Sequence, residues 1–388
     1  MTVVIASELG AGYGHATQIS LTAQCVVELG HRPVAVTRDI GTLRTVIGYQ
    51  TPCDVLAAPV RLRGAPQFTR VHSFADILVE AGFAELRDLT ARLRAWVSLF
   101  ELCKADHLVL DHAPTALFAA HAIGLPCVAT TSSFSIPPAV APFPSILPNA
   151  QTPPAVREQR ERQLLALLSQ ALGEIGLKAP DRLQDPFAHL PAGLANIAEL
   201  DHYGPRAQAR YLGCASHTVG TAPQWPLRGG ARLFFYAPWH PAIREGLQHL
   251  VDAGHRICAV IPNAPADAPT ADNLVLHRHL VDIHAALDAC EIFVGHCSIH
   301  SLIASLRLGK PCVMLPLWQE QNLLAHRVVQ TGAGLTVTPQ TIAAAVAQML
   351  QQMPTFAAAA QAFSQRHAAI DSRAAHLAFL RDTIGARA

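Results

Sequence analysis

The stretch from Val281 to Gly334 reads VDIHAALDACEIFVGHCSIHSLIASLRLGKPCVMLPLWQEQNLLAHRVVQTGAG. It contains two apolar runs, Ile292–Gly295 and Cys312–Leu315, and a helical pattern follows each of them. This alternation is typical of a parallel sheet, in which the carboxyl ends of the strands meet at one edge. Helix N-termini at that edge carry unpaired backbone N–H groups that bind anions. The stretch therefore predicts an open α/β sheet with a site for a phosphorylated ligand such as a diphosphate.

The residues at the two predicted turns fit such a ligand. Cys297, Ser298 and Ser301 are small, so a phosphate can approach the backbone closely. Glu320 and Gln321 stand at the start of the second helix and offer hydrogen bonds suited to the hydroxyl groups of a sugar. The residues alone indicate a phosphorylated ligand, and their order along the chain indicates more.

The order resembles the donor-binding half of GT-B glycosyltransferases, the superfamily of UDP-glucuronosyltransferases and macrolide glycosyltransferases. In that family a strand ends in His-Gly-Gly or His-Ala-Gly, and Pro-x-x-x-Asp/Glu-Gln follows after the next strand. The corresponding segments here are His296-Cys297-Ser298 and Pro316-Leu317-Trp318-Gln319-Glu320-Gln321. The resemblance extends over nearly the whole chain and is most specific at residues 281–334.

The resemblance implies a role for each donor-site residue. It places the pyrophosphate on His296 and on the backbone from Ser298 to Ser301, and the donor sugar on Glu320 and Gln321. The chain departs from the family pattern at two of these positions. Ser298 stands where glycine is usual, and His300 stands where a second glycine or a small residue is common. We include both among the donor-binding residues and expect a UDP- or dTDP-linked sugar as the co-substrate, with no separate cofactor.

A second motif lies near the N-terminus. The first apolar run leads into Gly10-x-Gly12-x-Gly14-His15, where Gly12 and Gly14 permit a tight turn and the close approach of a ligand. His15 is a candidate general base, because an imidazole near its ordinary pKa can take a proton from a hydroxyl group. Asp111 ends another strand and should emerge at the same sheet edge, where a carboxylate would fix the tautomer of the imidazole. The family has a histidine and an aspartate in these two roles.

The composition limits the class of protein. The chain has 388 residues, enough for two domains, and its 51% hydrophobic and 15% charged residues are typical of well-covered parallel sheets. A net charge of +1 gives no sign of a nucleic-acid partner. Nine cysteines without a C-x-x-C pair favour reduced thiols in the cytoplasm. No secretory signal or membrane span is apparent, while contact with a membrane surface stays open.

The order of strands and helices predicts an α/β protein of GT-B type, with two Rossmann-like domains facing across a cleft. We expect an acceptor-binding domain at residues 1–215, a linker at 216–230 and a nucleotide-sugar-binding domain at 231–355. The helices of residues 356–388 are expected to pack back on the first domain, as in GT-B proteins. The proline-rich segment Pro137–Pro154 is too long for a simple connector and is a candidate substrate loop.

The chain has 20 histidines, but no pair at metal-ligand spacing with a carboxylate stands out, so we expect no metal site. His296 and His300 are four residues apart and would share a helix face only if the helix began early. The absence of an Asp-x-Asp motif also argues against the metal-dependent GT-A class, in which that motif holds the cation.

These observations predict an inverting, metal-independent transfer of a sugar from a nucleotide-diphosphate donor to a hydroxyl group of a small-molecule or lipid acceptor. Three alternatives stay open. The first is a nucleotide-sugar epimerase of similar fold, and the second is a non-catalytic homologue that binds a ligand or partner. The third is an NAD-dependent oxidoreductase in which Asp39, after the second strand, would hold a ribose, although Gly14-His15 breaks the G-x-G-x-x-G pattern. The acceptor, the sugar and the oligomeric state are not predicted.

Overall fold

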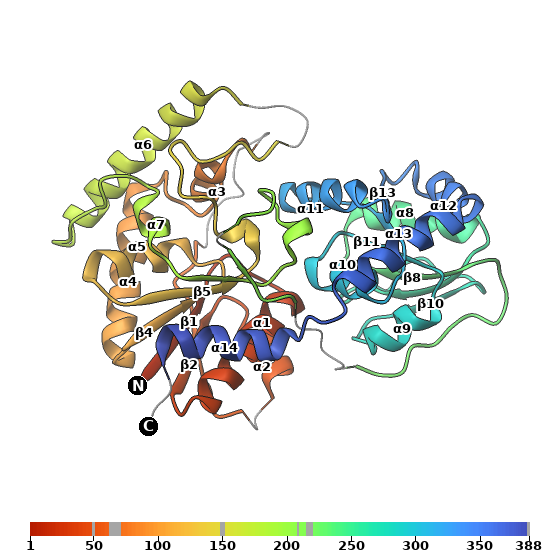
Figure 1. The fold of residues 1–388 in the computed structure, drawn as a ribbon, viewed down its shortest axis with the longest axis horizontal. Coiled ribbons are helices and arrows are strands. Elements are labelled where there is room, and N and C mark those ends of the chain that lie inside the picture. Colours follow the sequence, from red (N-terminus) through yellow and green to blue (C-terminus); the bar gives the residue numbers. More distant parts are fainter. Residues whose placement is uncertain (49–50, 62–70, 148–151, 208, 215–219, 386–388) are drawn as a thin grey trace. The chain divides into compact units, whose positions relative to one another are not determined.

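The chain divides into two compact units (Figure 1). The first comprises Met1–Ala215 and Asp371–Ala388, and the second comprises Ser216–Ile370. The structure, a computed structural model, describes residues 1–48, 51–61, 71–147, 152–207, 209–214 and 220–385.

The first unit is built on a seven-stranded sheet in which every pair of neighbouring strands is parallel. Its strands are β1 (Thr2–Ser7), β2 (Arg32–Thr37), β3 (Asp54–Ala57), β4 (His107–Leu110), β5 (Cys127–Thr131), β6 (Ala192–Leu194) and β7 (Arg210–Tyr211). The order across the sheet is β3-β2-β1-β4-β5-β6-β7, so the direction of strand addition reverses between β1 and β4. Ligands of open α/β sheets bind at the carboxyl ends of the strands beside such a reversal.

Helices cover both faces of this sheet. The helices of the first unit are α1 (Tyr13–Glu28), α2 (Ile40–Ile47), α3 (Phe74–Glu80), α4 (Leu86–Cys103), α5 (Pro114–Ile123), α6 (Pro154–Gly173), α7 (Asp185–Ala188) and α14 (Ser372–Ile384), with short 3₁₀ turns η1 (Ser133–Ser135) and η2 (Ala198–Leu200). Helices α1, α2 and α14 share one hydrophobic core with Val3 and Ile5 of β1. Val4 and Ala6 are equally buried and point to the opposite face, because successive side chains alternate along a strand. Both faces of the sheet are therefore covered.

The second unit has a six-stranded sheet with the order β10-β9-β8-β11-β12-β13, again with parallel neighbours. Its strands are β8 (Arg232–Tyr236), β9 (Arg256–Val260), β10 (Leu274–His277), β11 (Ile292–Gly295), β12 (Cys312–Met314) and β13 (Gly334–Thr336). Its helices are α8 (Pro241–Asp252), α9 (Ile283–Ala289), α10 (Ile299–Arg307), α11 (Gln319–Gln330), α12 (Ile342–Gln351) and α13 (Met353–Arg366). The strand order reverses between β8 and β11, so the carboxyl ends of these two strands mark the expected ligand position.

The predicted alternation of strands and helices is confirmed in both units. One boundary matters for the site: α1 begins at Tyr13, so Gly14 and His15 lie in its first turn and only Gly12 precedes it. The loop predicted at Pro137–Pro154 runs up to the start of α6 at Pro154, and its residues 148–151 lie outside the described part of the chain.

Residues 216–219 of the predicted linker also lie outside the described residues, and the rest of it belongs to the second unit. Thr221 forms a parallel bridge with Val281, and its backbone N–H donates to the carbonyl oxygen of Leu280 at 3.1 Å. A Cβ atom on Gly220 would overlap the backbone of Val281, so the two segments lie in direct contact. Thr221, near the start of the predicted linker, is therefore attached to the segment that precedes α9.

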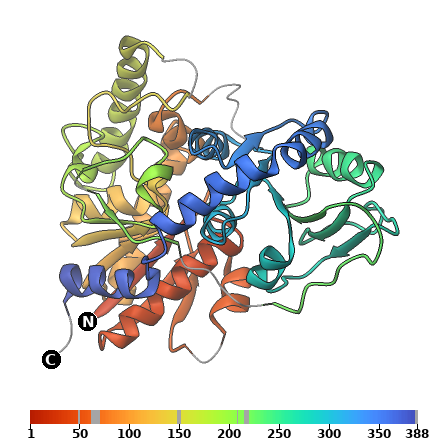
Figure 2. The same cartoon turned by 45° about the vertical axis from the view of Figure 1, so that its right-hand side comes forward.

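The segment 356–388, predicted as one group of helices, is divided between the two units. Helix α13 stays with the second unit, where the Ser364 hydroxyl donates to the Arg307 carbonyl oxygen at 2.6 Å. Helix α14 belongs to the first unit and lies along α1 in both views (Figures 1 and 2). Phe356 of α13 packs in the second core and Phe379 of α14 packs in the first, which explains the division.

Helix α14 is held to α1 by a buried polar contact as well as by apolar packing. His376 is fully buried, and its Nδ1–H donates to the Ser372 carbonyl oxygen at 2.7 Å. Its Nε2 atom therefore accepts from the Gln18 amide of α1, also at 2.7 Å. Burial lowers the pKa of His376 to about 4, against a smaller raising effect of the hydrogen bond to Ser372, so the ring is neutral near pH 7.

Candidate functional site

The carboxyl ends of β1 and β4 bring His15 and Asp111 together. His15 Nδ1 lies 2.9 Å from Asp111 Oδ2, and the two side chains are 27% and 3% exposed. Asp111 directly follows β4, and His15 lies in the first turn of the helix that follows β1. The pair thus occupies the strand reversal of the first sheet, where a ligand is expected.

Asp111 is held as a carboxylate by three donors. Oδ2 accepts from His15 and from the Ser7 hydroxyl at 3.1 Å, and Oδ1 accepts from the Thr131 hydroxyl at 3.1 Å. Burial alone would raise the pKa of Asp111. The charge and hydrogen bond of His15, with smaller effects of His112 and Thr131, outweigh burial and leave this pKa below its ordinary value. An ionised Asp111 requires a proton on His15 Nδ1, so the lone pair of the neutral ring is on Nε2.

The glycine-rich turn is shaped around the His15 ring. A Cβ atom on Gly10 would overlap the imidazole, so any other residue would displace the His15 ring. Gly12, the N-cap of α1, has φ 79°, which favours glycine. The Gly12 N–H donates to Asp39 Oδ2 at 3.2 Å, and Asp39 Oδ1 accepts from Thr42 N at 3.1 Å. Both oxygens of Asp39 therefore serve the backbone, which argues against the alternative in which Asp39 holds a ribose.

Sequence reasoning missed a second carboxylate beside this turn. Glu8 is buried, its Oε1 accepts from Thr115 N at 2.5 Å and its Oε2 accepts from Trp96 Nε1 at 2.9 Å. Burial raises the pKa of Glu8, and the charge of Arg92 with the bonds to Thr115 and Trp96 opposes this. Glu8 ties the turn after β1 to the start of α5, which follows Asp111. In the sequence, Trp96 has hydrophobic neighbours and Glu8 lies next to Ser7, and neither pattern predicts that these two side chains meet.

His112 was also missed, although it follows Asp111 directly. Its backbone has φ 51°, in the left-handed region, and its carbonyl oxygen accepts from Leu9 N at 3.1 Å. Its ring lies beside that of His15, with the two centroids 6.3 Å apart and an interplanar angle of 28°. Within the described residues, its Nε2 atom is buried without a hydrogen-bond partner. Burial, reinforced by the charge of His15, lowers the pKa of His112 to about 3, while Asp111 opposes this.

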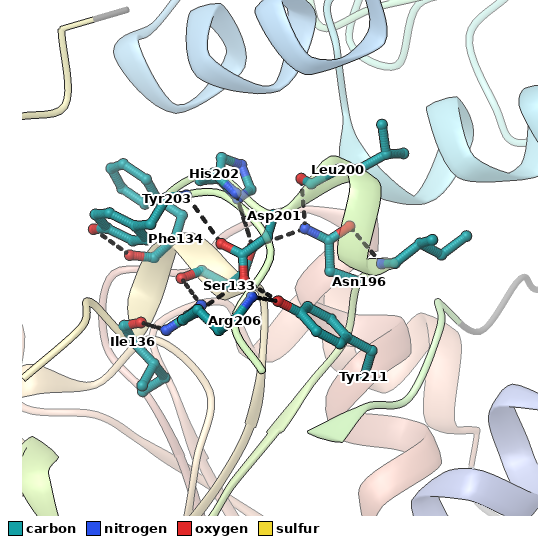
Figure 3. Close-up of polar contacts among 11 residues, drawn as sticks. Ser133, Phe134, Ile136, Asn196, Leu200, Asp201, His202, Tyr203, Arg206 and Tyr211 are labelled. Carbon is teal, nitrogen blue, oxygen red and sulfur yellow. Dashed lines mark hydrogen bonds and ion pairs between the residues drawn. The ribbon is translucent and has the colours of Figure 1, made fainter. Parts of the chain in front are cut away.

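A buried polar cluster fixes the segment that follows β5 (Figure 3). Asp201 is buried and accepts from Arg206 Nε at 2.9 Å and from the Tyr211 hydroxyl at 2.7 Å. Arg206 in turn donates to the Ile136 and Ser133 carbonyl oxygens at 2.7 and 3.3 Å. This cluster holds the loop after β6 against the loop after β5.

Aromatic contacts link this cluster to the neighbourhood of the His15–Asp111 pair. Ser133 Oγ lies 2.8 Å from His202 Nδ1, and the His202 ring packs edge-on to Phe134. Phe134 packs edge-on to His112, with centroids 6.2 Å apart. The edge of the first sheet thus presents a row of rings, from His15 through His112 and Phe134 to His202, fixed at its far end by an ion pair.

In the second unit, His296 follows β11 and lies beside the end of β8. Its Nδ1–H donates to the Tyr236 carbonyl oxygen at 3.2 Å, and the two rings have centroids 5.7 Å apart. A Cβ atom on Gly295 would approach the Tyr236 carbonyl oxygen to 3.0 Å and Phe293 more closely, which explains glycine before the histidine. Burial lowers the pKa of His296 to about 4, against the raising effect of the Tyr236 bond. The neutral ring therefore presents a lone pair at Nε2.

The turn after His296 enters α10. Cys297 is buried and has φ 67°, so it occupies the left-handed position that favours glycine. Ser298 has φ −62° and is the N-cap of α10, where serine is a preferred residue, and its side chain makes no capping bond. The Ser301 hydroxyl donates to the Ser298 carbonyl oxygen at 3.0 Å. His300 is the second residue of α10, whereas His296 precedes the helix, so these two histidines do not share a helix face.

The second predicted turn is shaped by Gln321. This side chain is buried, and its Oε1 accepts from Leu317 N at 2.7 Å. It therefore closes the turn before α11 with its oxygen. Glu320 lies one residue earlier, in the first turn of α11. Because Leu315 N donates to the Gly295 carbonyl oxygen at 2.9 Å, this turn and that of His296 leave neighbouring strands at the same edge.

Within the described residues, no three or more His, Cys, Asp or Glu side chains are grouped so that they could hold a metal ion. In the same part of the chain, every helix is too short or too polar to cross a bilayer.

No protein-family model and no curated protein matches the chain. Solved structures do match it. The calicheamicin glycosyltransferase CalG4 is 16% identical with a TM-score of 0.71, covering 99% of this chain and 98% of CalG4. The glycosyltransferase VinC in complex with dTDP is 15% identical with a TM-score of 0.66, covering 99% of this chain and 100% of VinC. SsfS6 from Streptomyces sp. SF2575, complexed with thymidine diphosphate, is 16% identical with a TM-score of 0.63, covering 98% and 99%. The chain therefore has the fold of these glycosyltransferases, and the predicted GT-B fold is confirmed.

Proposed function

We propose that the protein is an inverting, metal-independent glycosyltransferase that moves a sugar from a nucleotide diphosphate to a hydroxyl group of a small-molecule or lipid acceptor. The observation that carries this proposal is the 2.9 Å contact between His15 Nδ1 and Asp111 Oδ2 at the strand reversal of the first sheet. Proteins with the same fold include glycosyltransferases whose structures contain thymidine diphosphate (dTDP).

His15 acts as the base in this proposal. The acceptor O–H gives its proton to Nε2 as its oxygen attacks the anomeric carbon of the sugar. The bond from that carbon to the diphosphate breaks, and the diphosphate leaves with the bonding electrons. Attack from the side opposite the leaving group inverts the anomeric centre. Asp111 holds the tautomer and stabilises the imidazolium that forms, and proton transfer of this kind contributes about 10²–10⁴-fold to a rate.

The second unit would bind the donor. The backbone from Ser298 to Ser301, at the N-terminus of α10, would hold the diphosphate. His296 would contact the same group, and His300 would border it. Because the neutral His296 ring presents a lone pair at Nε2, it can donate to a phosphate oxygen only after protonation, which the diphosphate charge would favour. The amide N–H groups of Gln321 and the Glu320 carboxylate would hold sugar hydroxyls.

The test combines donor binding with turnover. Thermal shifts with UDP-, dTDP- and GDP-sugars, with NAD(H) and metal ions as controls, select a donor for an acceptor screen followed by mass spectrometry. We expect one dTDP- or UDP-linked sugar to stabilise the protein and to be transferred without added metal. His15→Ala should abolish transfer while leaving the thermal shift with the donor unchanged. Full transfer by His15→Ala would remove the base assignment, stabilisation by NAD(H) alone would overturn the proposal, and isomerised donor without acceptor would indicate an epimerase.

A further inference from the structure

Three features distinguish His112 from the other residues around the His15–Asp111 pair. It follows the proposed catalytic carboxylate, its backbone is in the left-handed region at φ 51°, and its buried Nε2 has no partner in the described part of the chain. A non-glycine residue in that conformation and a buried unpaired nitrogen are both unfavourable, and such features concentrate at functional sites. Neighbouring polar groups at this edge, among them both oxygens of Asp111, are paired.

Neighbouring residues contact both the backbone and the ring of His112. Its carbonyl oxygen accepts from Leu9 N, in the turn that carries Gly10 and leads to His15. Its ring is placed between His15 and Phe134, with centroid distances of 6.3 and 6.2 Å. Phe134 belongs to the loop that the Asp201–Arg206 ion pair fixes. The surrounding structure therefore holds an imidazole beside the proposed base.

We propose that His112 binds the acceptor, by a hydrogen bond to a second oxygen on the carbon next to the one that bears the reacting hydroxyl, or on the next carbon but one. Two nearly parallel rings with centroids 6.3 Å apart would each reach one oxygen of the same small molecule. The torsion χ2 is soft in histidine, so the ring could turn as the acceptor binds. The substrate class is thus a 1,2- or 1,3-dioxygenated acceptor. This inference rests on the proposed function.

The charge state of His112 fits this role and excludes the role of a second base. With a pKa of about 3 the ring stays neutral at physiological pH, so it has one N–H donor and one lone pair. It does not compete with His15 for the acceptor proton and does not form an ion pair with Asp111. It can donate to a carbonyl oxygen or accept from a hydroxyl, so its contribution should be to acceptor affinity and orientation.

The test compares 4-nitrocatechol with 4-nitrophenol, which differ by one neighbouring hydroxyl. Binding of each is measured by isothermal titration to the full chain. The variants are His112→Asn and His112→Gly, because asparagine and glycine both tolerate a left-handed backbone and should fold. His121→Asn is the matched control, since His121 is an exposed histidine on α5.

We expect the wild-type protein and the His121→Asn control to bind 4-nitrocatechol about tenfold to a hundredfold more tightly than 4-nitrophenol, as one buried hydrogen bond allows. Both His112 variants should reduce that ratio to about twofold while leaving 4-nitrophenol affinity unchanged. Equal or absent binding of both compounds by the wild type, or a preference that survives in both variants, would overturn the inference. Because binding is measured without turnover, loss of transfer with every donor would remove the proposed function and leave this result to stand separately.

Discussion

Replacing Asp111 with asparagine tests the proposed chemistry most directly. The carboxylate accepts from three donors, on His15, Ser7 and Thr131, and an amide can accept only through its one oxygen. If the amide NH₂ faces His15, it donates to Nδ1 and moves the ring proton to Nε2, so the base loses its lone pair. If the NH₂ faces Thr131, the tautomer survives but the negative charge that stabilises the imidazolium is lost.

Either orientation should lower kcat for transfer by about 10³-fold, which corresponds to about 4 kcal/mol of transition-state stabilisation. The affinity for the donor should be unchanged, because the residues proposed to bind the donor belong to the other unit. The assay is single-turnover transfer at saturating donor, with acceptor product quantified by mass spectrometry. Asp39→Asn is the matched control: asparagine can still cap α2 but has one acceptor oxygen in place of two, so one of the bonds to Gly12 N and Thr42 N is lost. The loss in stability should be about 1 kcal/mol, and kcat should change less than threefold.

The same substitution has a signature in stability against pH. The folded-state pKa of Asp111 lies below its unfolded value of about 3.9, so its contribution to stability is present above that value and is lost as pH falls through the folded pKa. Asp111→Asn should therefore flatten the acid limb of the stability curve below about pH 4.

An Asp111→Asn variant that retains more than about a tenth of the wild-type kcat would refute the proposed role of Asp111, because orientation of the base by a carboxylate contributes more than tenfold to kcat.

Three further predictions follow from individual contacts. Gly10→Ala should fold but lose transfer about a hundredfold, since the added methyl group displaces the His15 ring; unchanged activity with an unchanged melting temperature would contradict this. Donor binding should take up a proton, because a pKa of about 4 at His296 rises beside a diphosphate, so affinity should increase as pH falls from 7 to 5; calorimetry in two buffers of different ionisation enthalpy that gives equal heats would exclude it. His376 has a pKa of about 4 in the folded chain and about 6.5 in the unfolded chain, so the free energy of unfolding should fall by up to about 3 kcal/mol as the pH falls from 6.5 to 4. In His376→Gln, which can still pair with Gln18, the free energy of unfolding measured in urea should depend less steeply on pH across that range.

Much of the architecture could be predicted because it depends on local patterns. Apolar runs such as Ile292–Gly295 and Cys312–Leu315 identify buried parallel strands, and parallel strands place their carboxyl ends at one edge. That rule alone brings His15 and Asp111 to the same edge, and the structure places them 2.9 Å apart. The short outer strand β3, with mostly exposed residues, carried no such pattern and was not predicted.

The details of the site depended on contacts between distant residues. The sequence offers no reason to prefer a left-handed backbone at Cys297 over Ser298, because both are small polar residues at a turn. Gln321 was predicted to hold a sugar, and the bond that its oxygen accepts from Leu317 N was not predicted, because it forms only in the folded turn after β12. The His112 carbonyl oxygen accepts from Leu9 N, more than a hundred residues away in the chain, so no local pattern predicts this contact.

The division of residues 356–388 has a consequence for how the protein is made. Synthesis proceeds from the N-terminus, so β1 and α1 leave the ribosome long before α14, which covers part of their hydrophobic core. Until then Gln18 has no His376 to bond, and the apolar surface of α1 that Phe379 covers faces water. The second unit, formed by the continuous segment Ser216–Ile370, is complete when its own last residue emerges. The second unit can thus finish folding before the first. The hydrophobic core of the first unit stays partly exposed until α14 has been synthesised.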